Sequence, residues 1–166
     1  MAGPQCRRCR GTGEVTNRYG KRICHCVYRR AFRACMRRYE ESRAFGGLLS
    51  GAGLARRVSR CQGLSPEPRA YREAAYTADI ELTAKRALTG RSIGRAIWWY
   101  HFIHGCDWAN CIRLIRYQVG LPLDRGNYFH EVYRTEVMLG RVFLEMRPYS
   151  LCPKEYFGFY RRTSDE

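Results

Sequence analysis

The chain has 166 residues, of which 45% are hydrophobic and 13% aromatic, so it can bury a core and wholesale disorder is excluded. Its formal net charge of +15 excludes an acidic solvating protein, and its apolar runs fall well short of the roughly 20 residues that span a bilayer. The first residues lack the apolar segment of a secretory signal, and we therefore expect an intracellular protein.

The basic charge is concentrated in the first third of the chain. Residues 1–60 hold 15 Lys and Arg against 3 Asp and Glu, and Arg outnumbers Lys 27 to 3 over the whole chain. Guanidinium groups match phosphate geometry and also stack on bases. A GC-rich genome would explain Arg in place of Lys, but not the local excess over acidic residues. We therefore expect a polyanionic partner, DNA or RNA.

Four of the nine cysteines form a cluster near the N-terminus: Cys6, Cys9, Cys24 and Cys26. The first pair opens a C-x2-C-x-G-x-G motif, whose glycines let the backbone turn back toward the sulfurs. The alternating segment 15–23 contains the turn signals Asn17 and Gly20, which predicts a short β-hairpin that brings the two pairs together. We predict a tetrahedral Zn²⁺ site with these four thiolates, and either His25 or Cys35 is the alternative for one ligand.

The run Cys6-Arg-Arg-Cys9-Arg-Gly11-Thr-Gly13 resembles the zinc-binding units of two families. It is similar to the repeated unit of the DnaJ chaperone cysteine-rich domain and to the zinc motif of phage late-gene antitermination proteins. Both families use a second C-x2-C-x-G-x-G unit, whereas this chain has Cys24-His25-Cys26 in its place. The resemblance implies zinc binding and is confined to residues 6–13.

Residues 26–45 contain no Gly or Pro and predict a helix. An apolar stripe recurs along it at helical spacing: Tyr28, Phe32, Cys35 and Tyr39. A parallel basic stripe contains the residues that we expect to contact phosphates: Arg29, Arg30, Arg33 and Arg37. No acidic residue precedes Glu40 in this helix, so these arginines need a counter-charge from elsewhere. The alternative is a solvated face of a packed helix.

We predict a mainly α fold with four segments. A zinc knuckle, made of a short β-hairpin and followed by the basic helix, occupies residues 1–45. A linker punctuated by Gly and Pro occupies residues 46–69. A helical helix-turn-helix domain occupies residues 70–150, and an aromatic C-terminal tail occupies residues 151–166.

The helical domain is expected to contain helices at 70–88, at 92–105, after Asp107 and from Asp124 to Met146. The two aspartates are N-caps, and Gly105 is a helix stop. One face of the last helix is expected to be buried: Tyr128, Val132, Thr135, Leu139, Val142 and Met146. The opposite face has donors suited to bases and phosphates: Asn127, His130, Tyr133, Arg134 and Arg141.

Residues 107–146 resemble region 4 of bacterial sigma factors and related regulators. The run Asp124-Arg125-Gly126-Asn127-Tyr128, followed by Arg134 and Leu139, corresponds to the Ser-x-Gly-Thr-Val segment and basic helix of that family. The predicted turn, residues 116–123, is longer than the usual three or four residues. The resemblance implies that four side chains lie in or beside the DNA major groove: Arg125, Asn127, His130 and Arg134. It also implies RNA polymerase as a partner.

The combination of an N-terminal knuckle with such a helical domain resembles small regulators of phages and proteobacteria. We therefore predict a DNA-binding transcription regulator, cytoplasmic and nucleoid-associated, encoded by a bacterium or a phage. The alternatives are a zinc-dependent protein-interaction module and an RNA-binding zinc protein. We expect no enzyme: Arg134 replaces the second histidine of an H-E-x-x-H motif that begins at His130, and four cysteines leave no open position on the metal.

Overall fold

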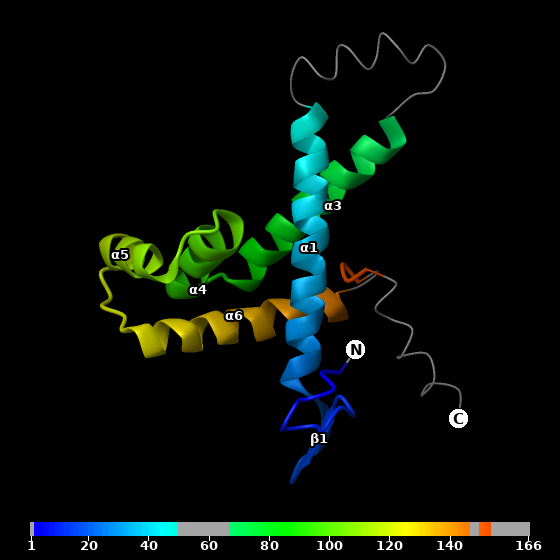
Figure 1. Cartoon of the computed structure of the whole chain (residues 1–166), viewed down its shortest axis with the longest axis vertical. Coiled ribbons are helices and arrows are strands. Elements are labelled where there is room, and N and C mark those ends of the chain that lie inside the picture. The colour runs from blue at the N-terminus through cyan, green and yellow to red at the C-terminus, as the bar shows by residue number, and fades with distance from the viewer. Residues whose placement is uncertain (1, 50–66, 147–149, 154–166) are drawn as a thin grey trace.

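The structure, a computed structural model, describes residues 2–49, 67–146 and 150–153. It confirms a mainly helical chain with a small N-terminal hairpin (Figure 1). The elements follow in the order β1 (Glu14–Asn17), β2 (Gly20–Ile23), α1 (His25–Leu49), α3 (Glu67–Ala87), α4 (Ser92–Ile97), η1 (Trp98–Ile103), α5 (Trp108–Val119) and α6 (Arg125–Glu145).

The predicted hairpin is confirmed. β1 and β2 pair antiparallel, with Asn17 opposite Gly20 at the turn. The Asn17 side chain accepts a hydrogen bond from the backbone N–H of Tyr19 at 2.9 Å, and Gly20 has φ +106, which an L side chain rarely adopts. At the base of the hairpin the backbone N–H of Cys24 donates to the carbonyl of Gly13 at 2.7 Å. The hairpin therefore delivers the chain directly to the start of α1.

α1 crosses both α3 and α6 and contributes more residues to the central core than any other element (Figure 1). Its predicted apolar stripe is confirmed: Tyr28, Phe32, Cys35 and Tyr39 are all buried. The Phe32 ring stacks parallel to that of Phe143 in α6, with centroids 6.2 Å apart, and meets Phe102 edge to face at 4.7 Å. Ile80 of α3 lies in the same core.

This shared core cuts across the predicted division into segments. α1 belongs to the predicted 1–45 module, yet it packs in one core with helices of the predicted 70–150 domain. Leu151 and Cys152, from the predicted tail, are buried in that core as well. The predicted linker 46–69 is partly helical, because α1 ends at Leu49 and α3 begins at Glu67. Residues 50–66 and 154–166 lie outside the described residues.

α6 is buried on a wider face than its sequence pattern predicts. Tyr128, Thr135 and Leu139 are buried as expected, whereas three other predicted core residues are only half-buried: Val132, Val142 and Met146. A second buried stripe was not predicted: Glu136, Gly140 and Phe143. These three residues recur at helical spacing, and α1 is the helix with the most extensive contact to α6. α1 therefore covers a face of α6 that the sequence pattern assigned to no partner.

The predicted helix at 92–105 is divided into two parts. α4 gives way at Trp98 to η1, a π-helical segment, in which the backbone N–H of His104 reaches the carbonyl of Trp99 at 3.1 Å. Gly105, with φ +66, ends the segment as predicted. Trp98 is buried in the central core, whereas Trp99 is 49% exposed.

α5 and α6 are successive helices joined by a short connection, as the predicted helix-turn-helix requires. Asp107 caps α5 by accepting hydrogen bonds from the backbone N–H groups of Ala109 and Asn110 at 2.9 and 3.0 Å. Asp124 caps α6 through the N–H of Asn127 at 2.8 Å. The connection is shorter than the predicted 116–123, because α5 continues to Val119 and ends at a left-handed glycine, Gly120. Within the described ranges, no helix combines the length and apolar character needed to cross a membrane.

Candidate metal centre and basic surface

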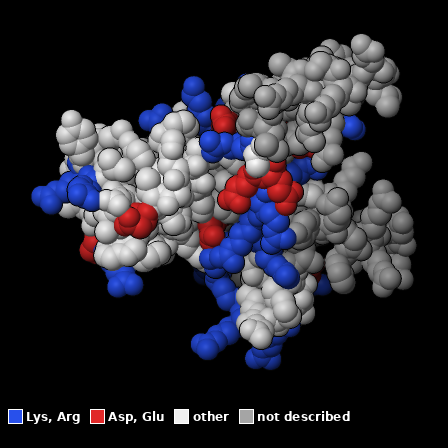
Figure 2. Space-filling view, turned by 45° about the horizontal axis from the view of Figure 1, so that its top comes forward, with Lys and Arg blue, Asp and Glu red and all other residues white. Residues whose placement is uncertain are grey.

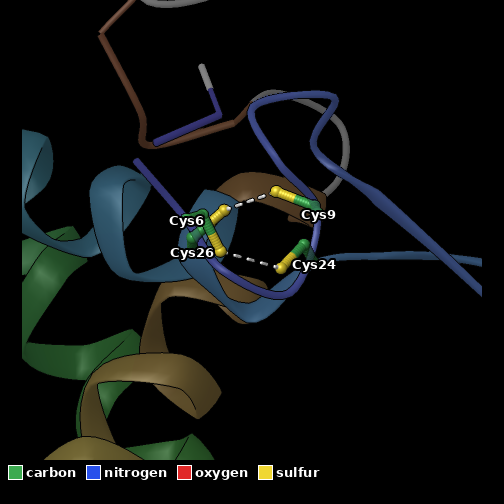
Figure 3. A group of neighbouring side chains, drawn as sticks. All are labelled: Cys6, Cys9, Cys24 and Cys26. Carbon is green, nitrogen blue, oxygen red and sulfur yellow. Dashed lines mark hydrogen bonds between the residues drawn. The ribbon is translucent and has the colours of Figure 1, made fainter. Parts of the chain in front are cut away.

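The four N-terminal cysteines converge on one point, as predicted. Their sulfur atoms all lie within 4.8 Å of one another and point toward one another in Figure 3. Sγ of Cys6 is 3.8 Å from that of Cys24, and Sγ of Cys9 is 3.5 Å from that of Cys26. A tetrahedral site with Zn–S bonds of about 2.3 Å has sulfur–sulfur edges of about 3.8 Å. The four thiols are therefore arranged to hold a metal ion.

Local backbone structure positions each pair of cysteines. Between Cys6 and the hairpin the chain makes a compact turn, in which the N–H of Arg10 donates to the carbonyl of Cys6 at 2.7 Å. Gly11 and Gly13 then take φ values of +89 and +83, which is why the motif has glycine at both positions. The second pair flanks the start of α1, and its spacing fits a strand that ends where a helix begins.

The thiols differ in how readily each becomes a thiolate. Backbone N–H groups of Cys9 and Arg8 lower the pKa of Cys6 to about 6. Burial raises the pKa of Cys26 to about 12 and also raises that of Cys24. Burying a thiolate costs free energy because the anion loses its hydration. A bound divalent cation offsets this cost with its own charge, so a thiol that coordinates the metal is deprotonated. The donor set, four cysteines in a largely closed site, is the kind that Zn²⁺ prefers in structural centres.

Neither alternative ligand enters the cluster. Nδ1 of His25 instead lies 3.1 Å from the hydroxyl of Tyr133 in α6, and Nη1 of Arg8 approaches it at 3.5 Å. Cys35 is buried in the central core, where it interacts with Cys152. The structure therefore favours the predicted ligand set over the two replacements.

α6 supplies one counter-charge for two of the four arginines in the basic stripe of α1. Nε of Arg29 and Nε of Arg33 both donate to the carboxylate of Glu136, the latter at 3.3 Å. The Glu136 side chain is only 8% exposed. Arg29 also lies over the ring of Tyr133, 4.9 Å from its centroid. Sequence reasoning missed Glu136, because Glu136, Gly140 and Phe143 include only one apolar side chain and form no apolar stripe.

A basic surface covers the knuckle and the N-terminal half of α1 (Figure 2). From residue 2 to residue 39 the chain has eleven Lys and Arg and one acidic residue, Glu14. Nine of the eleven are exposed: Arg7, Arg8, Arg10, Arg18, Lys21, Arg22, Arg30, Arg33 and Arg37. Of the four predicted phosphate contacts, Arg30, Arg33 and Arg37 thus belong to this surface, whereas Arg29 is half-buried between α1 and α6. We call these nine residues the basic surface.

The six predicted DNA contacts of α6 do not form a single face. Arg125, Asn127, His130 and Arg134 are exposed in its N-terminal half. Tyr133 is half-buried and turns toward α1, where it contacts His25. Arg141 is exposed near the opposite end of the helix.

Most of these side chains already have partners within the molecule. Arg134 pairs with Glu131 at 2.8 Å and Arg141 with Glu145 at 2.9 Å, both exposed pairs within α6. Arg125 lies over the ring of Trp108, 5.0 Å from its centroid, and Asn127 donates to the Asp124 carboxylate at 2.6 Å. Exposed ion pairs of this kind contribute little to stability.

Comparison with known proteins gives no relative for this architecture: no family model, no curated protein and no solved structure matches the chain. Functional conclusions therefore depend on the site itself.

Proposed function

We propose that the chain is a zinc-stabilised, DNA-binding transcription regulator. The observation that carries this proposal is the basic surface, because its nine exposed cations lie over the knuckle and the start of α1 with a single acidic residue among them in the sequence. Such a concentration of guanidinium groups attracts a polyanion and releases its counterions on binding. Zn²⁺ in the four-cysteine cluster would hold the N-terminal loop and the hairpin in place, and with them six of the nine cations of this surface.

The role of base reading is assigned to the N-terminal half of α6. The α5–α6 arrangement has the form of a helix-turn-helix, in which the second helix enters the major groove with its N-terminal residues toward the bases. Arg125, Asn127, His130 and Arg134 are exposed there and supply donors for base edges. A role with RNA polymerase rests on the resemblance to sigma factor region 4 alone.

The test is a zinc assay and a DNA titration on one purified sample. We expect one zinc per chain and binding to a random-sequence duplex that weakens steeply between a low and a high salt concentration. Preference for single strands or RNA would favour the RNA-binding alternative. Zinc without any affinity for nucleic acid at low salt would reject the proposal.

The role of α6 is tested separately with Arg134→Ala. If Arg134 contacts a base, the variant loses about 1–3 kcal/mol of binding free energy for a selected target sequence and little for random DNA. Arg141→Ala is the matched control, since Arg141 has the same kind of intrahelical pair but lies at the other end of α6. Equal, small effects of both substitutions would remove α6 from the interface.

A protein-interaction function is the second candidate, and one observation favours it. Large apolar side chains are exposed at the α4–α5 end of the molecule, with Tyr117 89% and Trp99 49% accessible. Exposed aromatic side chains are enriched where proteins meet. Loss of partner binding in a Tyr117→Ser variant that still binds DNA would place a second surface there.

A further inference from the structure

A groove of about 400 Å³ lies beside the metal centre. One wall is the N-terminal loop, residues 3–6, and the other is the first turns of α1, with Cys26, Arg29, Arg30 and Arg33. Three arginines of a single helix therefore line one groove. No carboxylate is among the residues that line it.

Arg29 and Arg33 are held in place by a carboxylate of α6. Arg29 and Arg33 both use Nε to donate to Glu136, whose side chain is almost fully buried between α1 and α6. A guanidinium group has five N–H donors, so the Nε contact with Glu136 leaves further donors on both residues. Because Glu136 already orders these side chains, binding an anion costs less conformational entropy than it would at free surface arginines.

The two walls meet at the metal ligands. Cys6 belongs to the loop wall and Cys26 to the helix wall, and both lie in the cluster of four thiols. Arg30 adds a direct link, because its guanidinium donates to the carbonyl of Ala2. A metal ion in the cluster would therefore fix the distance between the walls. Without the metal, the loop wall has few apolar contacts to keep it in position.

We propose that this groove binds a backbone phosphodiester of the nucleic acid, and that bound metal is required because it holds the loop wall against α1. This inference rests on the proposed DNA-binding function and specifies where the polyanion is held and how zinc controls it. Other exposed cations of the knuckle, among them Arg7, Arg8 and Arg10, follow the loop wall in the chain. The phosphate backbone of a nucleic acid bound in the groove can therefore continue onto them. Arginine forks match the geometry of phosphate oxygens.

A competing role for the same arginines is to balance the charge of the metal centre. Four thiolates around one Zn²⁺ carry a net charge of −2, and nearby guanidinium groups would compensate for it. In that case, substituting the arginines weakens zinc binding. In the phosphodiester case, zinc content stays constant and nucleic acid binding falls.

The experiment uses the full zinc-loaded chain and the double variant Arg30→Gln, Arg33→Gln. Lys85→Gln, Arg86→Gln is the matched control: it removes the same charge from exposed positions on α3, away from the groove. Affinity for a random-sequence duplex is measured by fluorescence anisotropy at several salt concentrations. We expect the groove variant to bind about tenfold more weakly than the control variant, with a salt slope smaller by about one.

The possible outcomes distinguish a failure of the groove inference from a failure of the proposed function. If wild-type protein binds no DNA, the proposed function fails. If it binds DNA and the groove and control variants behave alike, the groove inference fails and the proposed function stands. Loss of zinc from the groove variant would assign the arginines to the metal centre instead. Inorganic phosphate at fixed ionic strength distinguishes a free anion as the ligand: strong displacement of DNA by phosphate, and not by chloride, would overturn the phosphodiester assignment.

Metal dependence is tested on the same samples after chelation. Circular dichroism checks that α1, α3 and α6 remain folded, since their shared core does not include the cysteine cluster. We expect chelation to weaken DNA binding of the wild type at least as much as the groove substitutions do, because it also releases the other cations of the knuckle, and we expect the two effects combined to be smaller than their product. Independent, multiplicative effects of chelation and substitution would contradict a metal-held groove.

Discussion

Gly140 of α6 lies directly against the backbone of Tyr28 in α1. A Cβ atom on Gly140 would stand 1.9 Å from the carbonyl oxygen of Tyr28 and 3.1 Å from Cβ of Phe32. No real Cβ tolerates the first of these distances, and the obstacle is a helix backbone that cannot rotate away. The two helices therefore cross in contact because this position has no side chain, and the same packing brings His25, the first residue of α1, within 3.1 Å of the Tyr133 hydroxyl in α6.

Gly140→Ala should lower the stability of the fold. The added methyl group forces α1 and α6 apart and disrupts the stacking of Phe32 on Phe143. We expect the free energy of unfolding to fall by about 1–3 kcal/mol, after the better helix propensity of alanine has offset part of the cost. Urea unfolding followed by circular dichroism measures it. Gly126→Ala, at the exposed start of the same helix, is the control and should change stability little; a neutral Gly140→Ala would show that the crossing is looser.

Cys9→Ser should remove the metal without unfolding the helices. Serine cannot replace the thiolate in a four-sulfur centre, so zinc per chain, measured by atomic emission, should fall to near zero. The helical signal should persist, because α1 is held by the core it shares with α3 and α6. Cys106→Ser, outside the cluster, should retain full zinc. Full zinc content in Cys9→Ser would reject this ligand set.

Glu136→Gln tests the ion pairs that join α1 to α6. The substitution keeps the shape but leaves the positive charges of Arg29 and Arg33 without their carboxylate. We expect a loss of about 1–3 kcal/mol in the free energy of unfolding. Glu131→Gln breaks an exposed pair with Arg134 and should cost less than about 1 kcal/mol. Similar losses in the two variants would mean that burial does not increase the contribution of the Glu136 pairs to the free energy of unfolding.

Asp107 should make the stability of α5 depend on pH. The backbone N–H of Asn110, together with the Asn110 side chain and the N–H of Ala109, holds the pKa of the Asp107 carboxyl below its ordinary value. A depressed folded-state pKa stabilises the fold at neutral pH, and this contribution is lost as the pH falls below the ordinary value and through the folded-state pKa.

The measurement is the Tm of wild type and Asp107→Asn between neutral pH and acid. Asparagine keeps a capping oxygen but has no proton to titrate. We expect the Tm advantage of the wild type to shrink as the pH falls below the ordinary aspartate range. A constant difference in Tm over the whole range would show that the charge of Asp107 does not contribute.

The sequence alone determined the features that depend on neighbouring residues. The hairpin follows from its Asn17 and Gly20 turn, and the helix starts follow from the caps Asp107 and Asp124. The four-cysteine cluster was predictable because the hairpin between the two pairs is short and returns the chain to its origin. The turn and cap signals are local, because Asn17, Asp107 and Asp124 each bond a backbone N–H within three residues of their own position.

Only the tertiary structure decided which surfaces stay exposed. Arg29 and Glu136 are 107 residues apart in the chain, so no local pattern could pair them. The same holds for Gly140 and Tyr28, whose contact gives α6 a second buried face and turns Tyr133 away from the predicted DNA-binding side. Helical periodicity shows that a face is apolar or basic, but a buried charge needs a partner from whichever element packs against it. The crossing of α1 and α6 determines that partner. The residue pattern of either helix alone does not predict how the two helices cross.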